Sequence, residues 1–241
     1  MDIILMLVVI ALYGLSIGGG KSGKYLFLTA IVAHVAYIAL RWRLLGRVPV
    51  TERHDILIMM ALLTACGFPY FLKRIPLATL LNVLPVFVII LCFFGVFQDR
   101  VDTIEPNMNT LWFPLYMTLF IAGYGMLTLG AVAGIFFLFV RNESYERMQH
   151  RIVLLGWVMF SFALVAGSVW FYRVYGVYWL WTAKELWTTV TWFYFSFYLH
   201  ARLTNTLRGR LAAGVGVLGF GVMLFSYIGV TPILGSPWTQ F

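Results

Sequence analysis

The sequence predicts an all-α integral membrane protein, a polytopic bundle of about eight transmembrane helices. Of its 241 residues, 62% are hydrophobic and only 11% are charged. A soluble domain cannot cover its surface at that composition, and within a bilayer only helices satisfy their own backbone without closing into a barrel. The net charge of +8 reflects the Lys and Arg that collect in cytoplasmic loops, so no nucleic-acid partner is expected.

Eight apolar segments approach the roughly 20 residues that a transmembrane helix needs. They cover residues 2–18, 23–45, 55–73, 76–98, 110–140, 150–173, 184–203 and 210–234. The connections are short and contain no low-complexity stretch, so we expect a single membrane domain over residues 1–241. Gly130 and Gly134 form a G-x-x-x-G pattern, which predicts close packing of the fifth segment against a neighbour.

The basic residues set the expected orientation. With the N-terminus outside, inner connections carry ten of the 17 Lys and Arg residues, which agrees with the positive-inside rule. Eight crossings then place both termini on the outer side, together with residues 175–187.

One expected outer loop, residues 41–55, contains four arginines. Arginine binds carboxylates and phosphates through paired hydrogen bonds, which makes these side chains candidates for an anionic ligand. Contact with lipid headgroups is the alternative, and the sequence leaves both open.

The chain has four histidines, and two are candidate iron ligands. His34 lies in the middle of the second segment and His200 near the inner end of the seventh. An ionisable residue within a membrane helix indicates a functional site, and neutral imidazole binds iron. His54 and His150 lie at segment ends, where we expect a hydrogen bond to a neighbouring helix or a place at the headgroups.

Aromatic residues are unusually dense in YGVYWLWTAKELW, residues 175–187. An aromatic belt at the membrane surface explains a few rings at each helix end, but this density exceeds what a belt requires. A flat aromatic surface suits a large planar apolar ligand such as haem. Arg173, Lys184 or the arginines of residues 41–53 would then meet the haem propionates.

Lys184 and Glu185 stand side by side within this stretch. The pair could orient the aromatic residues or meet a partner protein. We favour a capping and anchoring role at the start of the seventh segment, where a carboxylate suits the helix N-terminus.

Residues 175–187 resemble the tryptophan-rich signature of the cytochrome c assembly protein family, which includes the CcsA, ResC and CcmC types. The family pattern is approximately W-G-x-Y-W-x-W-D-x-K-E-x-W. The matching residues are Gly176, Tyr178, Trp179, Trp181, Lys184, Glu185 and Trp187. Residues 34–55, 197–203 and 225–235 are also similar to stretches of this family, so the resemblance covers essentially the whole chain. His200 matches the intramembrane histidine that follows the motif.

The resemblance implies a protein of the bacterial cytoplasmic (inner) membrane that holds b-type haem, bound or in transit, at the outer face. It would present this haem to apocytochrome c or a multihaem cytochrome, beside a ResB-like assembly subunit. No catalytic residue is implied, and the chain would be at most a component of a haem–apocytochrome c ligase system.

Four features depart from the family pattern. Tyr175 replaces the first tryptophan of the motif, and Thr182 replaces an aspartate. Tyr116 stands where the first external histidine is expected, and residues 235–241 contain no histidine. Tyr116 could ligate the iron, as tyrosine does in some haem proteins. Otherwise His200 and His34 could hold haem within the membrane, or no haem is bound. In the last case the chain would be an interaction or regulatory subunit of a membrane complex, similar to relatives of the HemX type.

Overall fold

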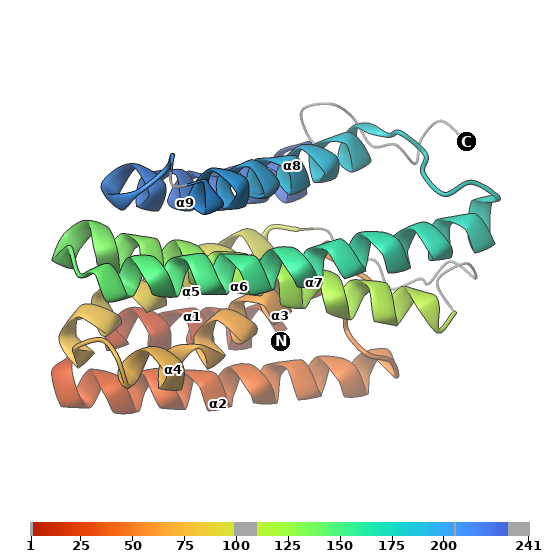
Figure 1. Ribbon diagram of the computed structural model, residues 1–241. Helices are drawn as coiled ribbons and strands as arrows, with labels where there is room; N and C mark the ends of the chain where they lie inside the picture. The colour runs from red at the N-terminus through yellow and green to blue at the C-terminus, as the bar shows by residue number, and fades with distance from the viewer. Residues whose placement is uncertain (1, 99–109, 205, 231–241) are drawn as a thin grey trace. The chain divides into compact units, whose positions relative to one another are not determined.

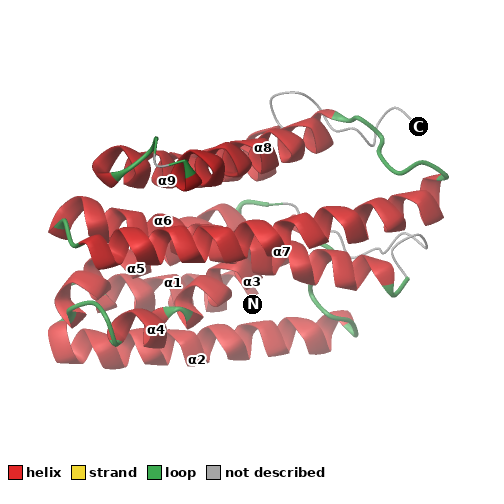
Figure 2. Ribbon diagram, in the orientation of Figure 1, coloured by secondary structure: helices red, strands yellow, loops and turns green. Residues whose placement is uncertain are grey.

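The computed structural model describes residues 2–98, 110–204 and 206–230, and its regular structure is helical, with no strand in these ranges (Figure 2). The chain divides into two compact units, Met1–Thr110 and Leu111–Phe241, and each is described by itself. The expectation of one domain over residues 1–241 stays a prediction. Residues 231–241, which include the tail without histidine, lie outside the described ranges.

In the first unit, α5 packs against α1 and α3, and α1 packs along α2. The helices are α1 (Asp2–Ser16), α2 (Gly20–Leu45), α3 (Arg53–Cys66), α4 (Phe68–Leu72) and α5 (Leu77–Val96) (Figure 1). The expected crossing over residues 55–73 is divided into α3 and α4 at Gly67. Pro69 explains the break, because it has no N–H to donate to the preceding turn and its ring clashes with that turn.

In the second unit, α6 and α7 form a long antiparallel hairpin, and α9 packs against α6 while α8 contacts α7 and α9. The helices are α6 (Trp112–Val140), α7 (Glu143–Tyr175), α8 (Ala183–Leu203), α9 (Gly209–Leu224) and the π-helix η2 (Phe225–Gly229) (Figure 1). The hairpin turn is short because Arg141 ends α6 in the left-handed region, at a φ of 55°. Asn142 then caps α7 by accepting a hydrogen bond from the Ser144 N–H at 2.9 Å.

Small residues allow α6 and α7 to approach closely. A Cβ atom built on Gly123 would lie 2.8 Å from the Phe160 backbone nitrogen, and one on Gly130 would lie 2.5 Å from the Val153 side chain. Any larger residue would therefore force the two helices apart. The close packing predicted from the G-x-x-x-G pattern is confirmed.

Among the described residues, six helical stretches are long and apolar enough to cross a membrane. They are Gly20–Leu45, Arg53–Leu72, Leu77–Val96, Trp112–Val140, Glu143–Tyr175 and Gly209–Gly229. Each of the eight expected segments is helical over most of its described residues, but α1 is shorter and α8 is less apolar. The amphipathic Trp and Tyr and the Thr residues of α8 lower its hydropathy. The protein is an integral membrane protein with a polytopic helical fold, as predicted.

Candidate functional site

The tryptophan-rich stretch forms the connection between α7 and α8, at one end of the second unit (Figure 1). Helix α7 ends at Tyr175 because Gly176 adopts a left-handed φ of 72°, and its N–H donates to the Tyr172 carbonyl at 3.0 Å. Glycine adopts this conformation without a steric penalty, so the motif glycine has a structural role as the helix stop.

Large aromatic side chains remain exposed on this connection. Trp181 is 68% exposed and Tyr178 is 59% exposed. Tyr178 stacks on Tyr172, with ring centroids 4.5 Å apart and an interplanar angle of 10°. Trp179 lies near Phe171, with centroids 6.5 Å apart. We call Tyr172, Tyr178, Trp179 and Trp181 the aromatic surface.

Trp181 has a strained backbone, with a φ of 58° in the left-handed region. For a residue with a Cβ atom this conformation costs on the order of 1 kcal/mol. The Glu185 carboxylate compensates, because its Oε2 atom accepts hydrogen bonds from the N–H groups of Leu180 at 2.9 Å and Thr182 at 3.3 Å. These two residues flank Trp181, so the carboxylate holds the backbone on both sides of the exposed ring.

The same carboxylate completes a capping box at the start of α8. The Thr182 hydroxyl accepts a hydrogen bond from the Glu185 N–H at 3.4 Å, and the Glu185 side chain bonds back to the Thr182 N–H. The capping role predicted for Glu185 is confirmed. Thr182 therefore keeps an N-cap oxygen at the position where the family pattern has aspartate, although it contributes no charge.

The neighbouring site candidates pack against other parts of the second unit. The Lys184 ammonium lies 5.9 Å from the Tyr227 ring centroid, and the Trp187 ring meets Phe225 edge-on at 4.7 Å. Both contacts join the start of α8 to η2, and π-helical turns often occur at functional sites. The exposed Arg173 guanidinium lies 5.6 Å from the Trp112 ring centroid.

Tyr116 lies partly buried beside the aromatic connection. Its ring stacks on Trp170, with centroids 6.3 Å apart and an angle of 15°. A Cβ atom on Gly167 would come within 3.0 Å of the Tyr116 ring, so this glycine provides the space for the tyrosine. Tyr116 also interacts electrostatically with Glu185, which places it within reach of the α7–α8 connection.

His200 lies at the other end of α8. It follows Trp187 by thirteen residues in the same helix, which corresponds to about 20 Å along the helix axis. His200 is exposed and cannot contact a ligand that rests on the aromatic surface. His34 belongs to the first unit, where it is buried with its Nδ1 atom 3.3 Å from the Tyr13 hydroxyl. Within the second unit the predicted site residues thus occupy two separate places, and His34 belongs to the other unit.

The second unit has no histidine beside the aromatic surface. Exposed rings suit a planar apolar ligand, but the only histidines of the second unit are His150 and His200, both at the far ends of α7 and α8. Within the described ranges no group of three or more His, Cys, Asp or Glu side chains could hold a metal ion. An axial histidine is therefore not supplied beside the aromatic surface within this unit.

Arg41 of the arginine-rich segment has a different role from either one expected. It is buried at the end of α2, where Nη2 donates to Glu52 at 2.8 Å and Nε donates to Asp55 at 3.0 Å. The expectation of an external anion or a lipid headgroup was wrong for this residue, because the chain supplies the carboxylates itself. Both acids lie within residues 41–55, close to Arg41 in the sequence, and this proximity could have predicted the pairing.

We call Arg41, Glu52 and Asp55 the closed cluster. Burial, followed by the charge of Asp55, raises the pKa of Glu52 above its ordinary value, although Arg41 and Arg47 act in the opposite direction. Arg47 also approaches Glu52, at 3.8 Å. The cluster therefore ties the α2–α3 connection to both helices.

His54 is a structural residue, as predicted. Its Nε2 atom lies 2.7 Å from the Tyr37 hydroxyl and its Nδ1 atom lies 2.8 Å from the Gly95 carbonyl oxygen. Both ring nitrogens are thus hydrogen-bonded to neighbouring helices.

A family model described as "Cytochrome C assembly protein" matches residues 50–235. The chain is 27% identical to the cytochrome c biogenesis protein CcsA of Chlamydomonas reinhardtii, over 83% of this chain and 62% of the relative. It is 24% identical to CcsA of Trieres chinensis, over 94% of this chain and 90% of the relative. A shorter match with CcsA of Synechococcus elongatus is 38% identical and covers 39% of this chain and 29% of the relative. The chain thus spans about three fifths of the length of the Chlamydomonas relative.

Proposed function

The chain belongs to the cytochrome c assembly protein family, and from this premise we propose that it handles haem for the maturation of c-type cytochromes. Haem is the cargo, and the aromatic surface receives its flat face. The observation that carries this proposal is that Trp181, a large aromatic residue, is exposed although its backbone is strained. A fold selected for stability alone would not retain that strain together with that exposure.

The Glu185 carboxylate supports the proposal because it presents the ring rather than binding a ligand. Its hydrogen bonds to Leu180 and Thr182 are made within the chain. A ring whose backbone is held before haem arrives loses less conformational entropy on binding. Arg173 follows Tyr172 of the aromatic surface and is exposed, so it is the cation proposed to meet a haem propionate.

The iron has three candidate ligands. Tyr116 lies beside the α7–α8 connection, whereas His200 and His34 would hold haem elsewhere, within the membrane. A carrier that releases its cargo benefits from weak ligation, and a surface without an adjacent histidine agrees with such a role. The variants Tyr116→Phe and His200→Ala locate the iron, because only the true ligand changes the visible spectrum of bound haem.

The orientation belongs to the same proposal. The second unit has its basic residues mainly at the end opposite the aromatic surface: Arg141, Arg147, Arg151, Arg202, Arg208 and Arg210. The aromatic end carries Arg173 and Lys184. The positive-inside rule then places the aromatic surface outside, in the cytoplasmic membrane of a bacterium, with both termini on that side. A ResB-like subunit and an apocytochrome c or multihaem cytochrome are the proposed partners.

A second candidate function is an interaction or regulatory subunit that does not load haem. The observation that favours it is the distance of about 20 Å along α8 between Trp187 and His200. In this case the exposed rings would contact a partner protein, and the purified chain would contain no haem.

The test is a visible absorption spectrum of the protein purified in mild detergent from haem-replete cells. We expect a Soret band in the wild type and at least about tenfold weaker haem binding in Trp179→Ala/Trp181→Asn, since each ring contributes on the order of 1 kcal/mol. Asparagine tolerates the left-handed backbone, so the connection keeps its shape. Holocytochrome c should fall in cells that carry this variant.

The matched control is Phe197→Ala, an exposed ring on α8 outside the aromatic surface. It should leave both the Soret band and the holocytochrome c level unchanged. Normal holocytochrome c in cells with the double variant would refute the haem-handling proposal. A folded wild type without haem would favour the regulatory subunit.

A further inference from the structure

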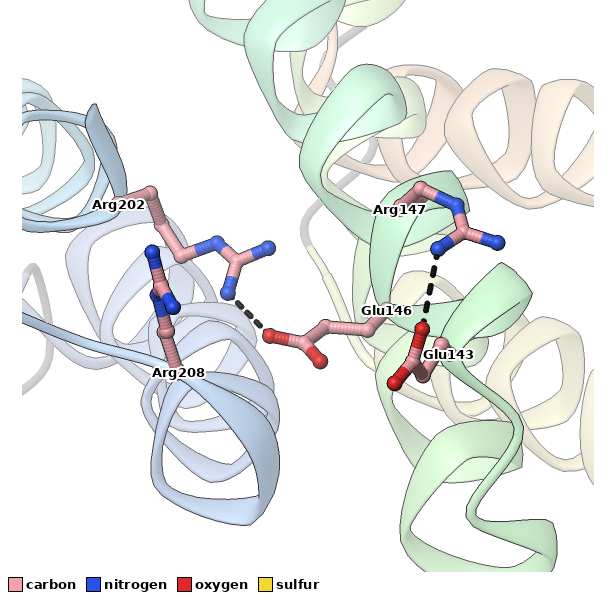
Figure 3. A pocket seen from close by; sticks show the side chains of 5 residues that line it. All are labelled: Glu143, Glu146, Arg147, Arg202 and Arg208. Atoms are coloured by element: carbon pink, nitrogen blue, oxygen red, sulfur yellow. Dashed lines mark hydrogen bonds and ion pairs between the residues drawn. The ribbon is translucent and has the colours of Figure 1, made fainter. Parts of the chain in front are cut away.

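A charged pocket lies in the second unit where α7 begins and α8 ends, at the end opposite the aromatic surface. Figure 3 shows the side chains that line it. Its volume is about 420 Å³, and every side chain that lines it is ionisable: Glu143, Glu146, Arg147, Arg202 and Arg208. These residues come from the start of α7, the end of α8 and the α8–α9 connection. The spans Glu143–Tyr175 and Gly209–Gly229 both begin here, so the pocket lies at the boundary of the membrane.

Both carboxylates of the pocket are already engaged within the chain. Glu146 pairs with Arg202 and also accepts a hydrogen bond from the Gly209 N–H at 2.9 Å. Glu143 pairs with Arg147 at 3.3 Å on the exposed side. Figure 3 shows Glu146 extending from α7 toward Arg202, with Arg208 on the same side as Arg202. Three arginines against two carboxylates leave the lining with a net positive charge.

Buried polar atoms behind the pocket lack partners among the described residues. The Arg202 Nε atom is buried without an acceptor. One turn further into the unit, the hydroxyl of the fully buried Tyr198 and the Nδ1 atom of His150 also have none. Buried polar groups are almost always hydrogen-bonded to protein, water or ligand. Arg202 interacts electrostatically with both Tyr198 and His150, so the three atoms belong to one positively charged region and can hydrogen-bond an oxygen-rich ligand or a water that it retains.

We propose that this pocket binds a phosphate group, with Arg202 and Arg208 as its main contacts. The guanidinium fork matches the geometry of phosphate oxygens. Basic pockets between membrane helices at this depth are suited to anionic lipid headgroups. The volume exceeds that of a single phosphate, which leaves room for the rest of a headgroup. The phosphate can come from an anionic phospholipid or from soluble phosphate, and neither source depends on the proposed haem function.

The experiment measures binding to the detergent-purified full chain by native mass spectrometry and by the shift of its thermal unfolding midpoint. The probes are phosphatidylglycerol, phosphatidylcholine and inorganic phosphate. We expect retention of phosphatidylglycerol over phosphatidylcholine, because the choline ammonium would lie beside arginines. Arg208→Gln should weaken this binding about fivefold, as removal of one basic contact at a membrane surface does.

The matched control is Arg210→Gln, an exposed arginine two residues away that does not line the pocket. It should change binding less than about twofold. Binding of inorganic phosphate that depends on Arg208, without preference for phosphatidylglycerol, would assign the site to soluble phosphate. Equal losses in both variants would mean diffuse attraction to the surface and would overturn the proposal. Failure of every phosphate probe to bind would do the same.

Tyr198→Phe provides a second variant that keeps the shape of the side chain. Loss of its hydroxyl should weaken phosphatidylglycerol binding about threefold or more if the hydroxyl bonds to the ligand or to a water beneath it. Unchanged binding together with unchanged stability would show that the Tyr198 hydroxyl is not part of the proposed site.

Discussion

Two clusters of the molecule use the same chemistry, arginine paired with carboxylate at helix ends, with opposite outcomes. In the closed cluster, the Arg41 side chain is 6% exposed and that of Glu52 is 2% exposed. In the charged pocket, the side chains of Arg202 and Glu146 are 12% and 15% exposed. In the closed cluster two carboxylates surround the Arg41 guanidinium, and Arg47 lies 3.8 Å from Glu52, whereas the pocket has more arginines than carboxylates and an open volume.

This comparison shows that two properties decide the role of an ion pair: the number of arginines relative to carboxylates, and whether an open volume lies beside them. The Arg41 guanidinium directs its Nε and Nη2 atoms to the chain's own carboxylates, and this pairing stabilises the connection that carries it. A guanidinium held in place by one carboxylate, beside an unfilled volume, is oriented and still able to bind an anion. Substitutions at Arg41, Arg202 and Glu52 test this comparison.

Replacing Arg41 should have the largest effect. Arg41→Gln removes the guanidinium that hydrogen-bonds both Glu52 and Asp55 in a buried site, and breaking a buried pair in this way costs about 3–5 kcal/mol. We expect a strongly lowered thermal unfolding midpoint in mild detergent. The exposed Arg43→Gln is the control and should cost less than about 0.5 kcal/mol.

The triple variant Arg41→Gln/Glu52→Gln/Asp55→Asn sharpens this test. Removal of all three charges should recover much of the lost stability, because no unpaired buried charge remains. Equal stabilities for Arg41→Gln and Arg43→Gln would show that the cluster is not closed.

Replacing Arg202 should have a smaller effect. Arg202→Gln leaves Glu146 with its hydrogen bond from the Gly209 N–H and with access to water, so the expected cost is about 1–3 kcal/mol. Arg208→Gln, at an exposed position, should change the free energy of unfolding by less than about 0.5 kcal/mol in lipid-free detergent. A cost for Arg202→Gln as large as that for Arg41→Gln would contradict the distinction between the two clusters.

The smallest expected effect is the contribution of Glu52 to the pH dependence of stability. Its pKa in the folded protein lies above the ordinary value of 4.5, so the folded state holds this proton more tightly than the unfolded chain. The resulting stability is complete below the ordinary pKa and is lost as the pH rises through the folded pKa. Relative to Glu52→Gln, the unfolding midpoint of the wild type should therefore fall as the pH increases from 4.5 upward. A difference that is constant with pH, or that rises, would contradict the cause assigned here.

Much of the fold was predictable because hydropathy over about 20 residues depends on composition alone. Each of the eight expected segments is helical over most of its described residues, and the division of one of them at Gly67 follows from Pro69. The lower hydropathy of α8 was also visible in its Trp, Tyr and Thr content. The candidate site was less predictable, because the residues singled out share a motif or a residue type without sharing a location. Trp187 and His200 illustrate this, since the helix between them separates them by about 20 Å.

The sequence by itself determined the helices, the family and the local geometry of the α7–α8 connection. Gly176 ends one helix, and Thr182 with Glu185 begins the next, because such caps involve residues within one turn of each other. Only the tertiary structure decided which charges meet. Arg202 pairs with Glu146, 56 residues away in the chain, and the unpartnered atoms behind them come from two different helices. Contacts of this kind depend on how helices pack and where connections return, which no local pattern encodes.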